Sequence, residues 1–141
     1  MGGRVPTALA NDMAAVASVK AFQTAEAALL AQLLTGLDAI PEADGTTLLD
    51  NTLVVWCQQI AAHDHSLAYI PYVLFGGLGG TVNTGRYVRY PRVPDNMAWP
   101  MYSGGRGHND LFVKLAQLMG LSGTTTFGNP AVCQGALDGL T

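Results

Sequence analysis

Two of the three histidines in the chain stand two residues apart, in the segment His63-Asp64-His65. In an extended segment, side chains at positions i and i+2 share a face, so both imidazoles can reach one metal ion. His108 would supply a third nitrogen ligand if it lies beside them. Three ligands and a water are typical of catalytic zinc, which acidifies the bound water for attack on an ester. The alternative is that His63 and His65 are ordinary polar loop residues, because the pattern is short and common.

Three arginines form a second candidate site, for an anion. Arg86 and Arg89 lie in a predicted hairpin, and Arg106 lies in a glycine-rich segment. Guanidinium groups bind phosphate or sulfate through forked hydrogen bonds, and the neighbouring glycines would let backbone N–H groups approach the same anion. The alternative is that these arginines are solvated and pair with Asp95 or Asp110.

The sequence assigns no catalytic residue. Ser66 and Ser103 are the serines closest to histidines, and neither stands in a G-x-S-x-G elbow. No order of base and acid partners follows from their positions. We therefore treat both as loop serines.

Two short apolar segments position the histidines. Residues 52–58 (TLVVWCQ) and 70–75 (IPYVLF) are nearly continuous apolar runs, typical of strands covered on both faces. In open α/β sheets, ligands lie at the carboxyl ends of parallel strands, and the histidine segment follows such an end. Cys57 falls within the first strand, so we expect a small buried cysteine, and a disulfide with Cys133 is the alternative.

Helices flank these strands. Residues 13–37 are alanine-rich, with apolar side chains every three or four positions, which predicts a long helix that covers the core. Residues 108–121 predict a second helix, capped by Asn109 or Asp110 and ended by Gly120. The expected buried stripe of this second helix consists of Leu111, Leu115, Leu118 and Met119.

The remaining segments predict smaller features. Residues 86–90 (RYVRY) alternate after a glycine-containing turn, which indicates a small antiparallel β-hairpin. The C-terminal tail is rich in turn residues, and we expect Ala136, Leu137 and Leu140 to dock it onto the body.

Composition sets the limits of these predictions. The 141 residues suffice for one domain, in which 49% are hydrophobic and 12% charged. That charged fraction is about half the usual quarter, which indicates either an unusually buried domain or a piece whose apolar surface the rest of a larger protein would cover. The net charge of -3, without a broad basic face, argues against nucleic acid. No apolar run is long enough to span a membrane, and the first residues lack a signal-peptide layout.

Four landmarks occur in a recognisable order: GTTLLDNTLVVW, a histidine-containing loop, IPYVLFGGLGGTVNTGRYVRY, and HNDLFVKLAQLMGL followed by FGN. Together they resemble the C-terminal part of the HxxSHH-motif proteins, exported bacterial proteins of unknown function related to the alkaline phosphatase and sulfatase superfamily. The resemblance covers residues 22–140. It implies an α/β fold, a partial alkaline-phosphatase-like sheet with a long N-terminal helix, a small hairpin and a C-terminal helix. It also implies an extracytoplasmic location.

The chain departs from the family pattern at two places. Where the relatives carry HxxSHH, this chain reads PTALANDMAAV, without histidine, and the superfamily nucleophile would lie upstream of Met1. Where the relatives place an acidic residue after the first strand, this chain has Gln58 and Gln59, and a neutral amide lacks the charge that a divalent cation favours.

Two hypotheses follow. In the first, residues 1–141 form the C-terminal portion of a larger α/β domain, a non-catalytic or incomplete module that self-associates or binds the missing N-terminal portion of the same protein. In the second, the chain is part of a metal-dependent phosphate- or sulfate-ester hydrolase, with zinc or another divalent ion bound by His63, His65 and His108.

Overall fold

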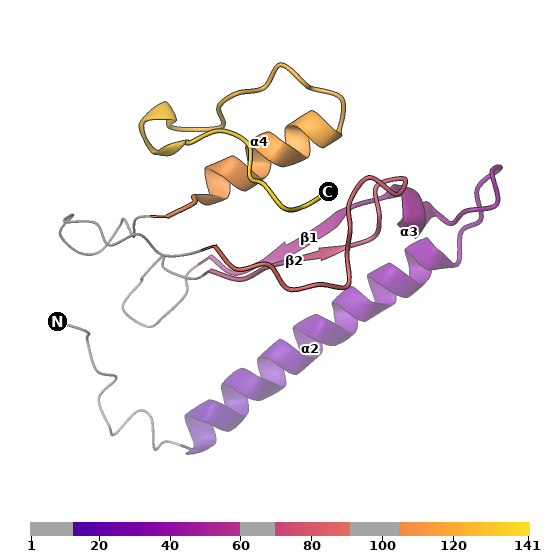
Figure 1. The fold of residues 1–141 in the computed structure, drawn as a ribbon. Coiled ribbons are helices and arrows are strands. Elements are labelled where there is room, and N and C mark those ends of the chain that lie inside the picture. Colours follow the sequence, from indigo (N-terminus) through magenta and orange to yellow (C-terminus); the bar gives the residue numbers. More distant parts are fainter. Residues whose placement is uncertain (1–12, 60–69, 91–104) are drawn as a thin grey trace, which may run out of the picture.

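The computed structural model describes residues 13–59, 70–90 and 105–141. Along the chain come helix α2 (Met13–Asp38), helix α3 (Leu48–Asn51), strands β1 (Val54–Cys57) and β2 (Tyr72–Phe75), helix α4 (His108–Leu118) and the 3-10 helix η1 (Pro130–Val132). The two strands form a small sheet, with α4 and the C-terminal tail on one side and α2 on the other (Figure 1). The prediction of a mixed α/β chain is confirmed at this level.

The two strands run antiparallel, so the expected parallel arrangement is wrong. Val54 pairs with Phe75 and Cys57 with Tyr72. This pairing puts the end of β1 beside the start of β2, so the segment between them returns to a neighbouring position and needs no crossover of the sheet. The histidine segment still departs from the carboxyl end of β1.

The strands are half-buried, although the sequence predicts cover on both faces. Val55, Tyr72 and Leu74 pack against the cluster formed by α4 and the tail. Side chains alternate between faces along a strand, so Trp56 and Val73, which pair with each other, belong to the opposite face. Val73 is 40% exposed, because no described helix packs closely over that face.

The core of the described residues lies between α4 and the tail. Leu111, Leu115, Leu137 and Leu140 form one buried cluster, and Val113 is fully buried beside them. The predicted docking of the tail through Leu137 and Leu140 is therefore confirmed.

The predicted hairpin at residues 81–90 is wrong, because this segment contains no strand. Two of its hydrogen bonds go to the tail. The Asn83 amide donates to the Leu140 carbonyl at 3.1 Å, and the Tyr90 hydroxyl donates to the Asp138 carbonyl. The alternating residues of this segment therefore form no strand. They lie in an irregular segment that hydrogen bonds to the C-terminal tail hold in place.

Helix α4 begins at His108 as predicted and ends at Leu118, before the predicted end at residue 121. Its N-cap is Gly107, so the prediction of Asn109 or Asp110 as the cap is wrong, and both of these side chains are buried within the first turn. Gly120, with φ of +94°, follows the helix end as expected. Met119, predicted to be buried, is 74% exposed because it lies beyond the last turn that faces the tail.

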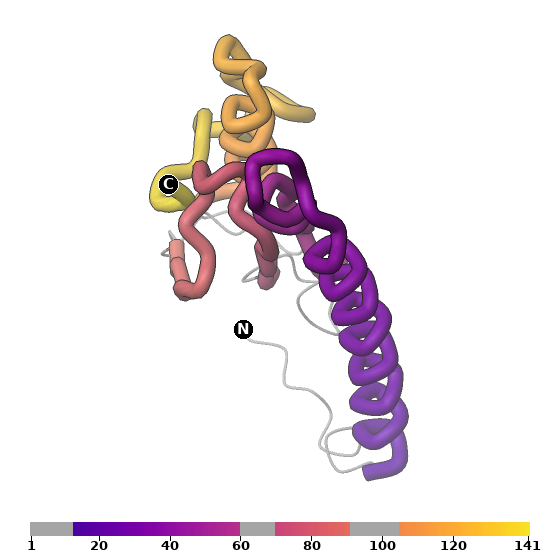
Figure 2. Tube along the Cα trace, turned by 90° about the vertical axis from the view of Figure 1, so that its right-hand side faces the viewer, coloured from indigo at the N-terminus to yellow at the C-terminus, as the bar shows by residue number. Residues whose placement is uncertain are grey.

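Helix α2 confirms the predicted length and contradicts the predicted role. It spans 26 residues, and none of them is buried. Among the other described elements it makes its main contacts with α3, at its C-terminal end, and the rest leads away from the body (Figure 2). A helix that touches the body at one end cannot cover the core.

Candidate functional site

The histidine segment is anchored by the paired ends of the two strands. His63 and His65 lie outside the described residues, so their side chains are not placed. The residues that enclose the segment are placed, because Cys57 closes β1 and pairs with Tyr72, which opens β2. The chain therefore leaves β1 and enters β2 at the same end of the sheet.

His108 lies near the same end of the sheet. It is the first residue of α4, it is exposed, and its ring packs edge-on against Phe112 at a centroid distance of 6.1 Å. Phe112 in turn packs edge-on against Tyr72 at 6.4 Å. Burial, and then the nearby Cys57, raises the pKa of Tyr72, which keeps its phenol neutral. Two ring contacts thus connect His108 to the residue where the histidine segment enters β2.

The described residues contain no group of three side chains that could hold a metal ion. Of the three predicted ligands, the structure describes only His108. The proposed metal site therefore stays a prediction about how His63 and His65 lie relative to His108.

Arg106 binds the chain itself. Its Nε donates to Asp110 Oδ2 at 2.7 Å, and Nη2 donates to the carbonyls of Gly135 at 3.1 Å and Ala136 at 2.7 Å. Its Nη1 lies 3.9 Å from Asp138 Oδ2. The predicted pairing of Arg106 with Asp110 is confirmed, and this pair connects the start of α4 to the tail.

Asp110 is the buried centre of this arrangement. Its side chain is fully buried, and Oδ1 accepts from the Gln134 amide at 2.7 Å, while its backbone carbonyl accepts from the Leu137 amide at 2.9 Å. Burial alone would raise the pKa of Asp110. The hydrogen bonds from Arg106 and Gln134, with the charge of Arg106, outweigh burial and hold the pKa below its usual value.

The other two arginines lie on the exposed segment before Pro91. Arg86 Nε donates to the Asn83 carbonyl at 2.9 Å, and Arg89 is exposed. Burial raises the pKa of Tyr90, and the charges of Arg106 and Arg86 both oppose this rise. The structure thus brings Arg86 and Arg106 within electrostatic reach of one phenol, with the Arg106 guanidinium already bound to protein atoms.

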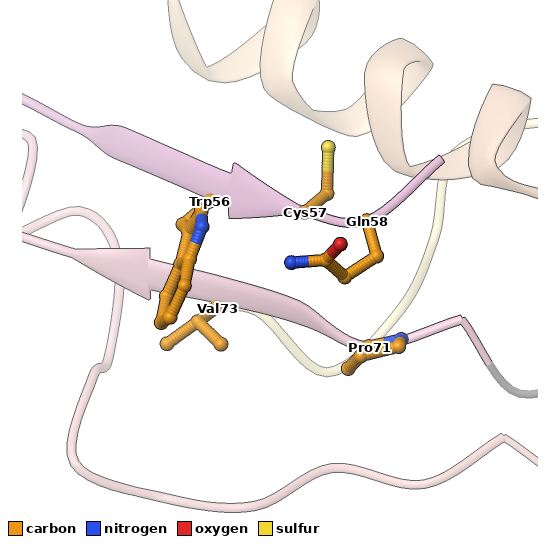
Figure 3. Close-up of a pocket in the computed structure, with 5 residues that line it drawn as sticks. All are labelled: Trp56, Cys57, Gln58, Pro71 and Val73. Carbon is orange, nitrogen blue, oxygen red and sulfur yellow. The ribbon is translucent and has the colours of Figure 1, made fainter. Parts of the chain in front are cut away.

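A shallow pocket opens at the same end of the sheet. Trp56, Cys57, Gln58, Pro71 and Val73 line it, and its volume is about 240 Å³, including space open to solvent. This hollow is open to solvent, so it does not enclose a drug-sized ligand as typical ligand pockets do. Trp56 lies across Val73, while Cys57 points to the other side of the sheet (Figure 3).

The two cysteines do not form a disulfide. Both Cys57 and Cys133 are free, and Cys57 is exposed, so its predicted burial is wrong. Cys57 is the last residue of β1.

Sequence reasoning gave the pairing of Arg106 with Asp110 only as the alternative to an anion site, and it missed the role of this pair in holding the tail. The two residues are four positions apart, with Arg106 just before α4 and Asp110 in its first turn. The hydrogen bonds that Asp110 accepts from Gln134 and Leu137 could not be predicted in this way, because these residues lie far from Asp110 in the sequence.

Comparison of the chain with protein-family models, with curated proteins and with solved structures finds no match. None of the described helices combines the length and the apolar character needed to cross a membrane.

Proposed function

We propose that this chain is a non-catalytic or incomplete C-terminal module of the HxxSHH-motif family. In this proposal it contributes structure to a larger, extracytoplasmic α/β domain with an alkaline-phosphatase-like sheet. The observation that carries the proposal is the use of Arg106 and Asp110, the charged pair beside the candidate site.

These two side chains are engaged within the protein. A site that acts on an anion needs donors that can reach it, and Arg106 directs Nε and Nη2 to Asp110, Gly135 and Ala136. A general acid or a metal ligand needs an accessible carboxylate, and Asp110 is fully buried with both oxygens hydrogen-bonded. Both groups therefore serve to hold the tail on α4.

The small sheet supports the second part of the proposal. Two-stranded sheets are marginal in water, and independent stability generally needs three or more strands or a packed helix. Here α4 and the tail cover one face, while Val73 on the other face is 40% exposed. A face of this kind is suited to being covered by the rest of a larger domain.

The second candidate function is a metal-dependent hydrolase acting on a phosphate- or sulfate-type ester. The observation that favours it is the position of His108. The His108 ring packs on Phe112, and Phe112 packs on Tyr72. These two contacts bring one imidazole near the start of β2, the strand that follows His63 and His65 in the sequence. A divalent ion bound there would supply an acidified water as nucleophile.

Elemental analysis of the purified chain tests the two candidates. Three proteins are compared: the unmodified chain, the His63→Ala/His65→Ala double variant, and Ser66→Ala as a matched control from the same segment. Each is also assayed against phosphate and sulfate monoesters. A non-catalytic module would hold metal far below one ion per chain in all three proteins, an incomplete site could bind metal, and the proposal expects no ester turnover in either case.

Near-stoichiometric zinc that is lost in the double variant and retained in Ser66→Ala, together with ester turnover, would contradict the proposal and establish the hydrolase. Zinc with the same pattern but without turnover would identify an incomplete site, which the proposal includes.

A further inference from the structure

Helix α2 presents a row of exposed apolar side chains. Val19, Phe22, Leu29 and Leu33 are exposed by 57%, 65%, 66% and 50%. They differ from Leu30, Leu34 and Leu37, which lie on the adjacent side of the helix and are half-buried. We call Val19, Phe22, Leu29 and Leu33, with Glu26 among them, the α2 seam.

The spacing of the α2 seam is that of a coiled coil. Positions 19, 22, 26, 29 and 33 alternate in steps of three and four, which is the a/d pattern of a helix that packs against another helix. At a rise of about 1.5 Å per residue the seam runs for about 20 Å along a helix of about 40 Å. Figures 1 and 2 both show that most of this length lies clear of the other described elements.

The exposed area of the chain indicates how much surface is available for a partner. The chain exposes 9970 Å² at a mass of 14.8 kDa. A compact monomer of this mass exposes about 7,000 Å². The exposed face of α2, in which none of the 26 residues is buried, contributes to this difference. Each subunit of a stable dimer typically buries ~800 Å².

We infer that the α2 seam binds the α2 seam of a second copy of this chain, in an antiparallel pair. A single seam is self-complementary in this orientation, because a positions meet d positions of the partner. One register places Leu29 against the partner's Val19, Leu33 against the partner's Ala15, and Glu26 against the partner's Phe22. Each layer then joins a larger side chain to a smaller or more flexible one.

The charge of Glu26 selects the orientation. A parallel pair would put the Glu26 carboxylates of the two copies directly opposite each other inside the seam, where like charges repel strongly. The antiparallel register separates them along the axis and lets each methylene stem cover the partner's Phe22. The inference is independent of the proposed function, because the seam uses neither the histidines nor the arginines.

The oligomeric state in solution tests the pair. Sedimentation or light scattering is measured over micromolar to sub-millimolar concentrations for the unmodified chain, for Leu29→Glu and for Ala28→Glu. Ala28 is the exposed neighbour of Leu29 and faces away from the seam, so its variant adds the same charge at a matched position. Circular dichroism checks that all three keep their helix content.

We expect a dimer for the unmodified chain and for Ala28→Glu, and a monomer for Leu29→Glu. A monomeric unmodified chain, a dimeric Leu29→Glu, or equal loss of the dimer in both variants would overturn the inference.

The orientation has its own measurement. A spin label is attached at Thr35→Cys in a background where Cys57 and Cys133 are replaced by serine. In the antiparallel register the two labelled positions stand about 30 Å apart along the axis, by the helical rise of about 1.5 Å per residue. A distance near the width of a helix pair, about 10 Å, would instead show a parallel pair and overturn the antiparallel arrangement.

Discussion

Helices α2 and α4 show opposite relations between helix length and packing. Helix α2 has 26 residues and none is buried, whereas α4 has 11 residues, five of which are buried. Isolated helices shorter than about 12–15 residues are marginal in water, so α4 needs its tertiary contacts. Helix α2 is rich in alanine, the best helix former, and its helical state depends less on contacts within the chain.

The comparison separates two kinds of information in the sequence. Periodic apolar residues predict that a helix forms, and they predict an apolar stripe on its surface. They do not predict which part of the molecule covers that stripe. In α4 the tail covers it, through Leu137 and Leu140, and in α2 the described part of the chain leaves it open.

Truncating one leucine in each helix gives the largest expected contrast. Leu111→Ala removes a side chain that is 4% exposed, and we expect it to lower the free energy of unfolding by about 2–5 kcal/mol. Leu29→Ala removes a 66% exposed side chain, and at concentrations where the chain is monomeric we expect a change within about 0.5 kcal/mol. Urea unfolding followed by circular dichroism measures both. Equal losses would mean that α2 packs on the body in solution.

The ion pair of α4 gives the next largest effect. Asp110→Asn keeps the shape of the side chain and removes the charge that Arg106 binds. We expect a loss of about 2–3 kcal/mol, below the cost of breaking a fully buried pair, because Arg106 is 24% exposed and water can solvate it.

Asp138→Asn is the matched control for this loss. Its carboxylate lies 3.9 Å from Arg106 and is 93% exposed, so we expect a change below about 0.5 kcal/mol. The same urea transitions report both variants. A loss in Asp138→Asn as large as in Asp110→Asn would show that the tail is held by charge at the surface and not by the buried pair.

The pH dependence of stability isolates the contribution of the Asp110 charge. The pKa of Asp110 is lower in the folded chain than the ordinary value of 3.8, so the unfolded chain binds the proton more tightly. The stabilisation is therefore fully present above pH 3.8 and is lost as the pH falls through the folded pKa. Urea midpoints of the unmodified chain and Asp110→Asn should differ by a constant amount near neutral pH and converge below pH 3.8. A difference that persists at low pH would assign the effect to packing.

The sequence predicted those features of the fold that depend on local pattern. Both long helices were found from their three- and four-residue spacing, and α4 starts at the predicted residue and ends at Leu118, before the predicted end at residue 121. Both strands were found, but their direction was not, since apolar runs look alike in parallel and antiparallel pairs. The segment 81–90 was predicted as a hairpin because its bonds to the tail, such as Asn83 to Leu140, join residues far apart in sequence.

The candidate site also has one contact that the sequence could predict and others that it could not. The Arg106–Asp110 pair was within reach of sequence reasoning as one of two alternatives, because the two residues are four positions apart. The hydrogen bonds from Arg106 to Gly135 and Ala136 could not be predicted from the sequence, because the acceptors are backbone carbonyls that every residue carries.

Replacing Glu26 gives a smaller expected effect than truncating Leu111 or neutralising Asp110, and it tests the exposed helix α2 instead of the packed helix α4. Glu26 is the one charged member of the α2 seam, and a polar residue at a single a position reduces the stability of a coiled coil while it fixes orientation. We expect Glu26→Leu to tighten the dimer by about tenfold, which corresponds to about 1.4 kcal/mol, and to permit the parallel orientation as well. Sedimentation gives the dissociation constant, and spin labels at Thr35→Cys report a mixture of distances. Lys20→Leu is the control, because Lys20 lies outside the seam and its variant should leave the constant unchanged. A dimer weakened by Glu26→Leu would mean that Glu26 binds a group on the partner, so that the seam is held together by charge as well as by apolar packing.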